Sequence, residues 1–137
     1  MARSKKRWII TPPRPPKPKV TEAVKAEVER RANELVESTL KPNHIKPPPE
    51  DTNWNYVVGI YTKWHRSYFY FYAKHCSPGP NAISPNFEVG FARMGYIGDD
   101  KYNLSYMRHT GQWWEIYQEL SLDECLETIE GEPHFIP

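Results

Sequence analysis

Aromatic residues alternate along the second half of residues 54–74, WNYVVGIYTKWHRSYFYFYAK. In an extended strand, neighbouring side chains point to opposite sides, so three tyrosines share one side while Phe69 and Phe71 share the other. Phenylalanine is buried more often than tyrosine, whose hydroxyl needs water or another partner. We therefore assign the phenylalanines to the core and the tyrosines to a wetter face. These tyrosines are Tyr68, Tyr70 and Tyr72.

The whole stretch predicts a β-hairpin. In its first half both sides have apolar content, which is typical of a strand with one face covered by a helix. Residues 63–67, KWHRS, then connect the two strands. Lys63, His65 and Arg66 are therefore expected at an exposed, basic tip.

A long helix is predicted over residues 22–40. Thr21 can accept a hydrogen bond from an unpaired amide, and Glu22 places a negative charge in the first turn. Apolar residues recur at helical spacing on one side, while charged residues on the other side indicate a solvated surface. Pro42 is expected to end the helix, and residues 41–51 to form a stiff linker. The apolar stripe consists of Val24, Val28, Ala32, Leu35, Val36 and Leu40.

Three further strands are predicted after a proline-rich loop. The first begins near Phe87 and is expected to change phase near Arg93 and Gly95, which indicates a bulge. The next two cover residues 102–106 and 113–117, with short turns between them. Since no crossover helix interrupts these connections, the pattern predicts an antiparallel meander.

The end of the chain carries the clearest local signal. Ser121 and Glu124 spell a capping box, and Gly131 provides a stop for a short helix. Cys125 lies on the apolar side of this helix, and we interpret it as a small buried hydrophobe. Together the elements predict an α+β fold, with one long N-terminal helix packed on a five-stranded antiparallel meander sheet and a short C-terminal helix.

The order of these elements resembles a bacterial family of small domains of unknown function. The resemblance covers residues 22–137 and rests on the last strands, the capped helix and the ending EPHF. It implies this same fold and carries over no catalytic residue. The residues that carry it are Ala92, Arg93, Gly111, Trp113, Tyr117, Glu132, Pro133 and Phe135.

Charge divides the chain into two parts. Residues 1–20 contain seven Lys or Arg and no acid, whereas residues 21–137 contain eleven Lys or Arg against seventeen Asp or Glu. We expect residues 1–20 to form an extended basic, proline-rich arm and residues 21–137 to form a single α+β domain. With two cysteines and no long apolar run, the sequence predicts a cytoplasmic protein that does not bind membranes.

Catalysis and metal binding have no clear signature in the sequence. His75 and Cys76 are neighbours, but on a strand they point to opposite faces, which prevents activation of the thiol. The five histidines and two cysteines lack the short spacings of zinc modules, and no glycine-rich phosphate loop is present. We therefore expect no catalytic residue, no metal and no cofactor. A deep pocket collecting His65, His75, His109 or Cys76 would favour an enzyme instead.

The leading hypothesis is a non-enzymatic module that binds RNA or DNA. The arm would neutralise phosphates, and the tyrosines with their neighbouring cations would stack bases and hold the backbone. The rival hypothesis is a protein–protein adaptor that uses the proline-rich arm and the acidic body. The residues assigned to nucleic acid are Arg3, Lys5, Lys6, Arg7, Trp8, Arg14, Lys17, Lys19, Lys63, Arg66, Tyr68, Tyr70, Tyr72 and Lys74.

Three questions stay open at this level. The tyrosines either face solvent or pack beneath the long helix. The arm binds nucleic acid, binds a protein, folds back onto the acidic body, or is a solvated, disordered terminus. The oligomeric state has no signature in the sequence.

Overall fold

The computed structural model of the chain describes residues 19–45, 55–77 and 86–137. Helix α1, Glu22–Leu35, is followed by η2, Val36–Leu40, and α2, Lys41–His44; helix α3, Leu122–Gly131, and the short η3, Pro133–Phe135, end the fold. The strands are β1 Tyr56–His65, β2 Tyr68–Cys76, β3 Asn86–Gly98, β4 Lys101–Met107 and β5 Trp113–Leu120. They form one antiparallel sheet in the order β1-β2-β3-β4-β5, which confirms the predicted α+β meander.

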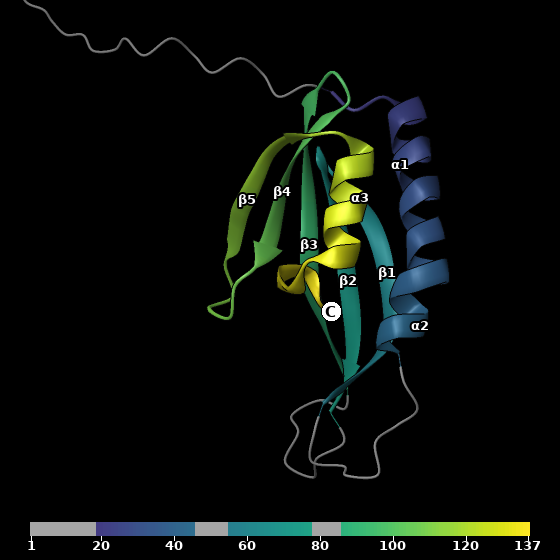
Figure 1. Cartoon of the computed structure of the whole chain (residues 1–137), viewed down its shortest axis with the longest axis vertical. Coiled ribbons are helices and arrows are strands. Elements are labelled where there is room, and N and C mark those ends of the chain that lie inside the picture. Colours follow the sequence, from purple (N-terminus) through teal and green to yellow (C-terminus); the bar gives the residue numbers. More distant parts are fainter. Residues whose placement is uncertain (1–18, 46–54, 78–85) are drawn as a thin grey trace, which may run out of the picture.

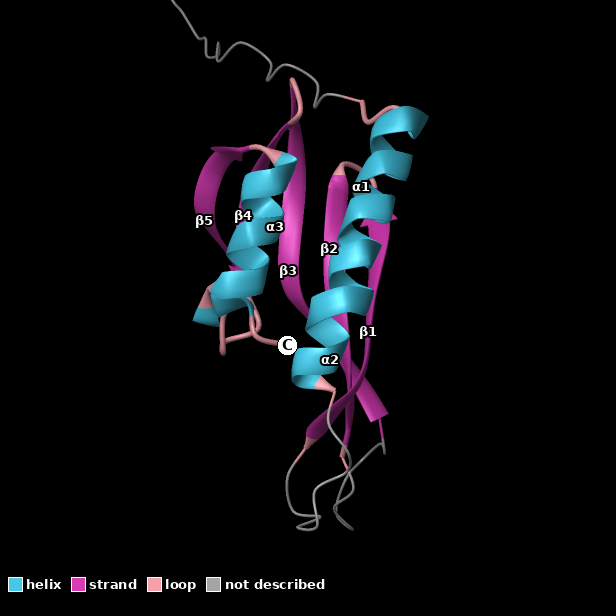
Figure 2. Cartoon of the chain, turned by 45° about the vertical axis from the view of Figure 1, so that its right-hand side comes forward, coloured by secondary structure: helices cyan, strands magenta, loops and turns pink. Residues whose placement is uncertain are grey.

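Helices α1 and α3 lie on the same face of this sheet, and Figures 1 and 2 show them side by side in front of the strands. The core between the layers contains Val28 and Ala32 from α1 and Cys125 from α3, packed in one cluster with Phe69 and Phe71. All five are almost completely excluded from solvent. The assignments of the two phenylalanines and of Cys125 to the core are therefore confirmed. Burial raises the pKa of the Cys125 thiol to about 12, so this cysteine is an inert core residue.

The predicted end of the first helix is wrong by one turn. The chain remains helical through Pro42 to His44, with a wider π-helical turn at Val36–Leu40. The amide of Lys41 donates to the carbonyl of Val36, five residues back. In a regular α-helix the ring of Pro42 would clash with the carbonyl four residues earlier, and the wider turn relieves that clash. Thr21 caps the start as predicted, accepting a hydrogen bond from the amide of Val24 at 3.2 Å.

The hairpin connection is shorter than predicted. Strand β1 continues to His65, and only Arg66 and Ser67 form the turn, with Arg66 at a φ of 58°. Lys63 therefore lies within the strand rather than at the tip. Apolar residues occur on both sides of β1 because a bulge between Val57 and Gly59 shifts the pairing with β2.

The predicted phase change in the third strand exists but lies earlier in the chain. Phe71 pairs with Ala92 and Tyr72 pairs with Gly90, so the extra residue of the bulge is Phe91. Phe91, Ala92 and Met94 all enter the core as a result. From the sequence alone the bulge is predicted near Arg93 and Gly95. The extra residue at Phe91 becomes visible only when the pairing of β3 with β2 is known.

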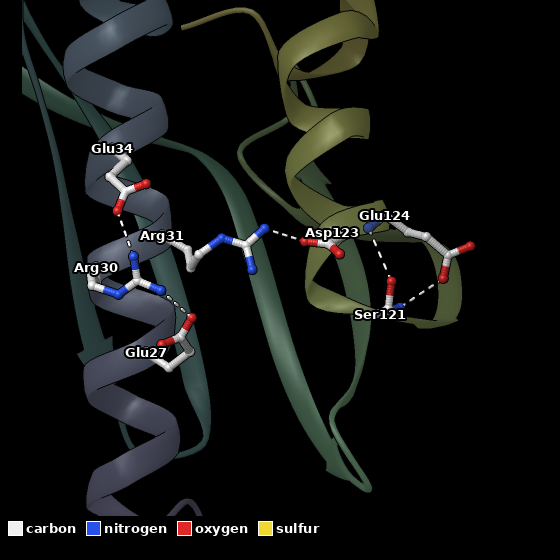
Figure 3. Close-up of polar contacts among 7 residues, drawn as sticks. All are labelled: Glu27, Arg30, Arg31, Glu34, Ser121, Asp123 and Glu124. Atoms are coloured by element: carbon white, nitrogen blue, oxygen red, sulfur yellow. Dashed lines mark hydrogen bonds and ion pairs between the residues drawn. The ribbon is translucent and has the colours of Figure 1, made fainter.

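The C-terminal helix begins as predicted. The hydroxyl of Ser121 accepts from the amide of Glu124, and the carboxylate of Glu124 accepts from the amide of Ser121, so both halves of the capping box are present (Figure 3). Arg31 of α1 donates to the carboxylate of Asp123 and links the two helices. Tyr117 donates to Glu132 at 2.7 Å and fixes the segment after α3. Two residues that carried the family resemblance are thus direct partners.

Candidate nucleic-acid interface

The predicted tyrosines lie on the face of the sheet opposite the helices. Phe69, Phe71 and Ala73 point into the helix-covered core, so the alternating side chains of β2 point the other way and are only half-buried. The alternative in which the tyrosines pack beneath the long helix is therefore wrong. Two further rings join them, one from β1 and one from β5. We call the five residues Tyr61, Tyr68, Tyr70, Tyr72 and Trp113 the open aromatic face.

These rings form a continuous surface. Tyr61 and Tyr72 pair across β1 and β2 and stack with ring centroids 5.2 Å apart. Tyr72 in turn stacks on Tyr70 at 5.7 Å, and Tyr70 contacts Tyr68 at 6.2 Å and Trp113 at 5.8 Å. Ring pairs at such separations attract one another beyond their burial. The five side chains therefore support each other in place on a rigid sheet.

Arg93 lies in the middle of this surface. Its guanidinium carbon is 4.6 Å from the ring centroid of Tyr68 and 5.1 Å from that of Trp113. Its Nε is buried and finds no hydrogen-bond partner among the described residues. The guanidinium is thus held by two aromatic rings, a geometry that preserves its charge and its planar arrangement of donors. Lys63 adds a second cation, with Nζ 5.6 Å from the centroid of Tyr72.

Two glycines of β3 make room for these rings. A Cβ added to Gly90 would lie 2.8 Å from the indole carbon Cζ2 of Trp113, and one added to Gly95 would lie 2.9 Å from Cε1 of Tyr68. Real Cβ atoms do not approach so closely, so each ring lies directly on glycine backbone. Glycine inside a strand commonly marks such a close approach. The two glycines bracket Arg93 and bring the rings close on either side of it.

Two phenols of the face, those of Tyr61 and Tyr72, have a raised pKa and are neutral donors. Tyr61 donates to Glu88 at 2.9 Å, and burial together with this hydrogen bond raises the pKa of Tyr61. Burial is also the main cause that raises the pKa of Tyr72. On the opposite side of the molecule, α3 carries four acidic residues and no Lys or Arg. A polyanion therefore meets the cations and rings of the sheet more favourably than it meets α3.

The structure brings together some of the predicted site residues and separates others. Tyr68, Tyr70, Tyr72 and Lys63 form part of one surface, and Lys74 follows on the same side of β2, exposed, opposite Glu88 of β3. Arg66 lies in the hairpin turn at the end of the sheet, and Lys19 is exposed just before α1. The remaining predicted positions, Arg3, Lys5, Lys6, Arg7, Trp8, Arg14 and Lys17, lie outside the described residues.

Two rings of the face and the arginine that lies among its rings were missed from the sequence. Tyr61, Arg93 and Trp113 come from three different strands, and only the pairing between strands reveals that they meet Tyr70 and Tyr72. A usable signal was present in the glycines at positions 90 and 95, because strand glycines mark sites where another group approaches the backbone.

A separate pocket of about 360 Å³ lies at the end of the sheet. It collects His75 and His109, two of the residues considered for an enzyme, together with His134, while His65 and Cys76 do not line it. His75 and Cys76 point to opposite faces of β2, as expected, since His75 pairs with Val57 and Cys76 with Tyr56.

Within the described ranges, no group of three His, Cys, Asp or Glu side chains is arranged to hold a metal ion. None of the helices in the same ranges is long and apolar enough to cross a membrane.

A family model matches residues 20–137 of the chain, which is nearly all of its length and includes every helix and strand described above. The chain belongs to DUF3024. This family is described as a domain of unknown function. No curated protein and no solved structure shows significant similarity to the chain. The DUF3024 match confirms the resemblance to a family of small uncharacterised domains. It begins at residue 20, the last residue of the predicted basic arm.

Proposed function

We propose that this DUF3024 domain binds single-stranded RNA or DNA on its open aromatic face, and that the basic arm adds affinity. One observation carries the proposal. Helices α1 and α3 both cover the same side of the sheet, and this leaves a row of five partly exposed rings with Arg93 and Lys63 among them.

Stacking is the interaction that this face offers to a base. Each nucleobase has a planar π face, and stacking on an aromatic side chain contributes about 1–3 kcal/mol per base by alanine substitution. The rings of Tyr70 and Tyr72 are nearly parallel, with an interplanar angle of 26°, and both are rigidly supported by the strand. In a duplex the base faces are already stacked on each other, so a single strand is the form that can use this surface.

Charge supports the same ligand. Lys63, Lys74 and Arg93 on the sheet can neutralise phosphates that lie between stacked bases. The carboxylates of α3 lie on the other side of the molecule and disfavour binding there. The seven Lys and Arg of residues 1–20 add a sequence-independent contribution. If all seven contact phosphates, the logarithm of the binding constant falls with the logarithm of salt concentration with a slope of about −5.

The test is fluorescence anisotropy of labelled oligo-dT and oligo-U with the full chain, measured across a salt series. We expect salt-dependent binding that Tyr70→Ala weakens by about 5- to 150-fold, the equivalent of one lost stacked base. Trp114→Ala is the matched control, because Trp114 is an exposed aromatic residue that pairs with Tyr106 on the helix side of the sheet. Equal losses in both variants, or no binding at low salt, would contradict the proposal.

A second candidate function is protein binding, which one observation favours. Residues 86–91 of β3 pair only with β2, because the pairing with β4 begins at Ala92. Phe87 and Val89 on this stretch are 38% and 36% exposed. An unpaired strand edge with exposed apolar side chains can accept an extended strand from a partner. Pull-down with the full chain, washed at high salt, separates this function from the first, because an apolar edge contact survives salt that removes phosphate contacts.

A further inference from the structure

The pocket at the end of the sheet lies in a notch between three segments. Strand β4 ends at Met107, so the residues of β3 that precede Ala92 have no pairing with β4. Residues of the turn after β4 and of the segment after α3 then line the space beside β3. The resulting volume of about 360 Å³ is in the range of pockets that hold small ligands.

The wall of this pocket has two chemically distinct parts. His75, Arg108, His109 and His134 supply nitrogen donors, and no Asp or Glu side chain lines it within the described part of the chain, although the last residue of the sequence, Pro137, also lies in its wall. The other part is apolar and includes Val89, Phe91, Met107 and Ile136. A ligand that fits both parts has an anionic head and an apolar or aromatic body.

Three of the four nitrogen-bearing groups are held by aromatic rings. His75 stacks on Phe87 with ring centroids 5.0 Å apart and an interplanar angle of 7°. The ring of His134 lies 4.7 Å from that of Tyr106, and the guanidinium carbon of Arg108 lies 4.7 Å from the centroid of Trp114. Phe87 covers one face of His75, the ring of Tyr106 is tilted by 50° against His134, and the N–H groups of these side chains stay available to a ligand. Donors fixed in this way bind an anion with a smaller entropic cost than free side chains.

We propose that this pocket binds a phosphate monoester, with the phosphoryl oxygens accepting hydrogen bonds from Arg108 and the surrounding histidines and the ester group lying on the apolar wall. Arg108 supplies the fixed positive charge, because a guanidinium recognises phosphate with two parallel hydrogen bonds. This inference does not rest on the proposed function of the open aromatic face. The monoester belongs either to a small molecule or to the phosphorylated end of a nucleic acid.

Binding of a dianion here is linked to protonation. Burial lowers the pKa of His75, so its imidazole is neutral at neutral pH in the free protein. The groups that face His75 across the sheet, Val57 and Phe87, carry no charge, and the titratable and charged groups on the pocket wall are His109, His134, Arg108 and the terminal carboxyl group of Pro137. Glu132 lies behind His134, with 3.8 Å between its Oε1 and Nδ1, and accepts from Tyr117. A bound dianion favours protonated imidazole, so affinity rises as the pH is lowered from about 8 to about 6, where the ester begins to lose its second charge.

The test is a titration of the full chain with phenyl phosphate, followed by the imidazole C–H resonances in NMR. The chain has five histidines, and His44 and His65, which do not line the pocket, are internal controls in the same spectrum. We expect saturable shifts of His75, His109 and His134, with those of the two controls unchanged. Shifts that affect all five histidines equally, or no saturable shift, would overturn the proposal.

Variants sharpen the result and identify the source of the phosphate. Arg108→Gln is expected to weaken binding of phenyl phosphate at least tenfold, because a bidentate charged contact is lost. His65→Gln is the control and should leave the affinity unchanged. Equal affinities of the two variants would contradict the proposal. An oligonucleotide with a 5′-phosphate is compared with its 5′-hydroxyl form. Stronger binding of the phosphorylated form, lost in Arg108→Gln, identifies a nucleic-acid end. Tight binding of phenyl phosphate without that gain identifies a small molecule, and both results support a phosphate monoester site.

Discussion

The indole of Trp113 rests directly on the backbone of Gly90, so closely that a Cβ at position 90 would lie 2.8 Å from Cζ2 and 3.0 Å from Cη2 of the ring. The contact joins β5 to β3, two strands that are not neighbours in the sheet. It places the indole beside Tyr70 and Arg93 and completes the open aromatic face.

Gly90→Ala tests this contact. The added methyl group must displace the indole or the strand, and inserting carbon into a close-packed site costs about 1–3 kcal/mol. We expect a lower midpoint of urea unfolding and weaker binding of oligo-dT, because the ring that contacts Tyr70 has moved. Gly59→Ala is the matched control on β1, where a Cβ would meet only the Cβ of Lys74 at an ordinary 3.7 Å. Equal effects of the two substitutions would contradict the close approach at Gly90.

Arg93→Lys tests the role of the stacked guanidinium. Lysine keeps the positive charge but loses the planar group that lies between Tyr68 and Trp113. We expect binding of single-stranded oligonucleotides to weaken by about 5- to 30-fold, on the order of 1–2 kcal/mol for a partly desolvated cation–π contact. Arg30→Lys on α1, where the guanidinium pairs with Glu27 and Glu34, is the control and should leave binding unchanged. If Arg93→Lys bound oligonucleotides as tightly as the unchanged protein, Arg93 would not be part of the interface.

The alternation of Tyr and Phe in β2 was enough to predict both faces of that strand, because the period of two is a local property. The capping box at Ser121 and the cap at Thr21 were predictable for the same reason, since both ends of each hydrogen bond lie within three residues. Pro42 misled the prediction because a π-turn can absorb a proline that an α-helix excludes.

The candidate site was harder to predict than the fold. Tyr70 and Trp113 are far apart in the sequence, and their contact depends on the register of every strand between them. The bulge at Phe91 moves the pairing by one residue, and a single-residue error in register exchanges the two faces of a strand. Arg93 and Trp113 were therefore recognised as family residues without a place in the binding surface.

The Arg31–Asp123 pair is expected to link the two helices only weakly. Both side chains are partly exposed, at 34% and 70%, so water and salt screen their attraction. A double-mutant cycle with Arg31→Ala and Asp123→Ala should give a coupling free energy of about 0.2–1 kcal/mol in urea unfolding at low salt. The coupling should decrease when the salt concentration is raised to about 1 M. A large coupling that does not change with salt would contradict this account of the pair.

The capping box predicts a specific dependence of stability on pH. Hydrogen bonds from the backbone and side chain of Ser121 lower the pKa of Glu124 below its usual 4.5 in the folded protein. The ionised form is therefore favoured by folding, and its stabilising effect is complete above the unfolded pKa and lost as the pH falls through the lower, folded value. We expect Glu124→Gln to lower the melting temperature at about pH 7 and to have little effect at about pH 3. Glu127→Gln, at an exposed carboxylate of the same helix, is the control, and a pH-independent difference for Glu124→Gln would contradict the account.

Binding of nucleic acid to the open aromatic face can be tested directly by NMR on the full chain. Oligo-dT is added stepwise, and the amide and aromatic resonances are followed. The account predicts saturable shifts at Tyr68, Tyr70, Tyr72, Arg93 and Trp113, with the resonances of α1 and α3 unchanged. Shifts confined to the helices, or to residues 1–20 with the sheet unaffected, would contradict the assignment of nucleic-acid binding to the open aromatic face.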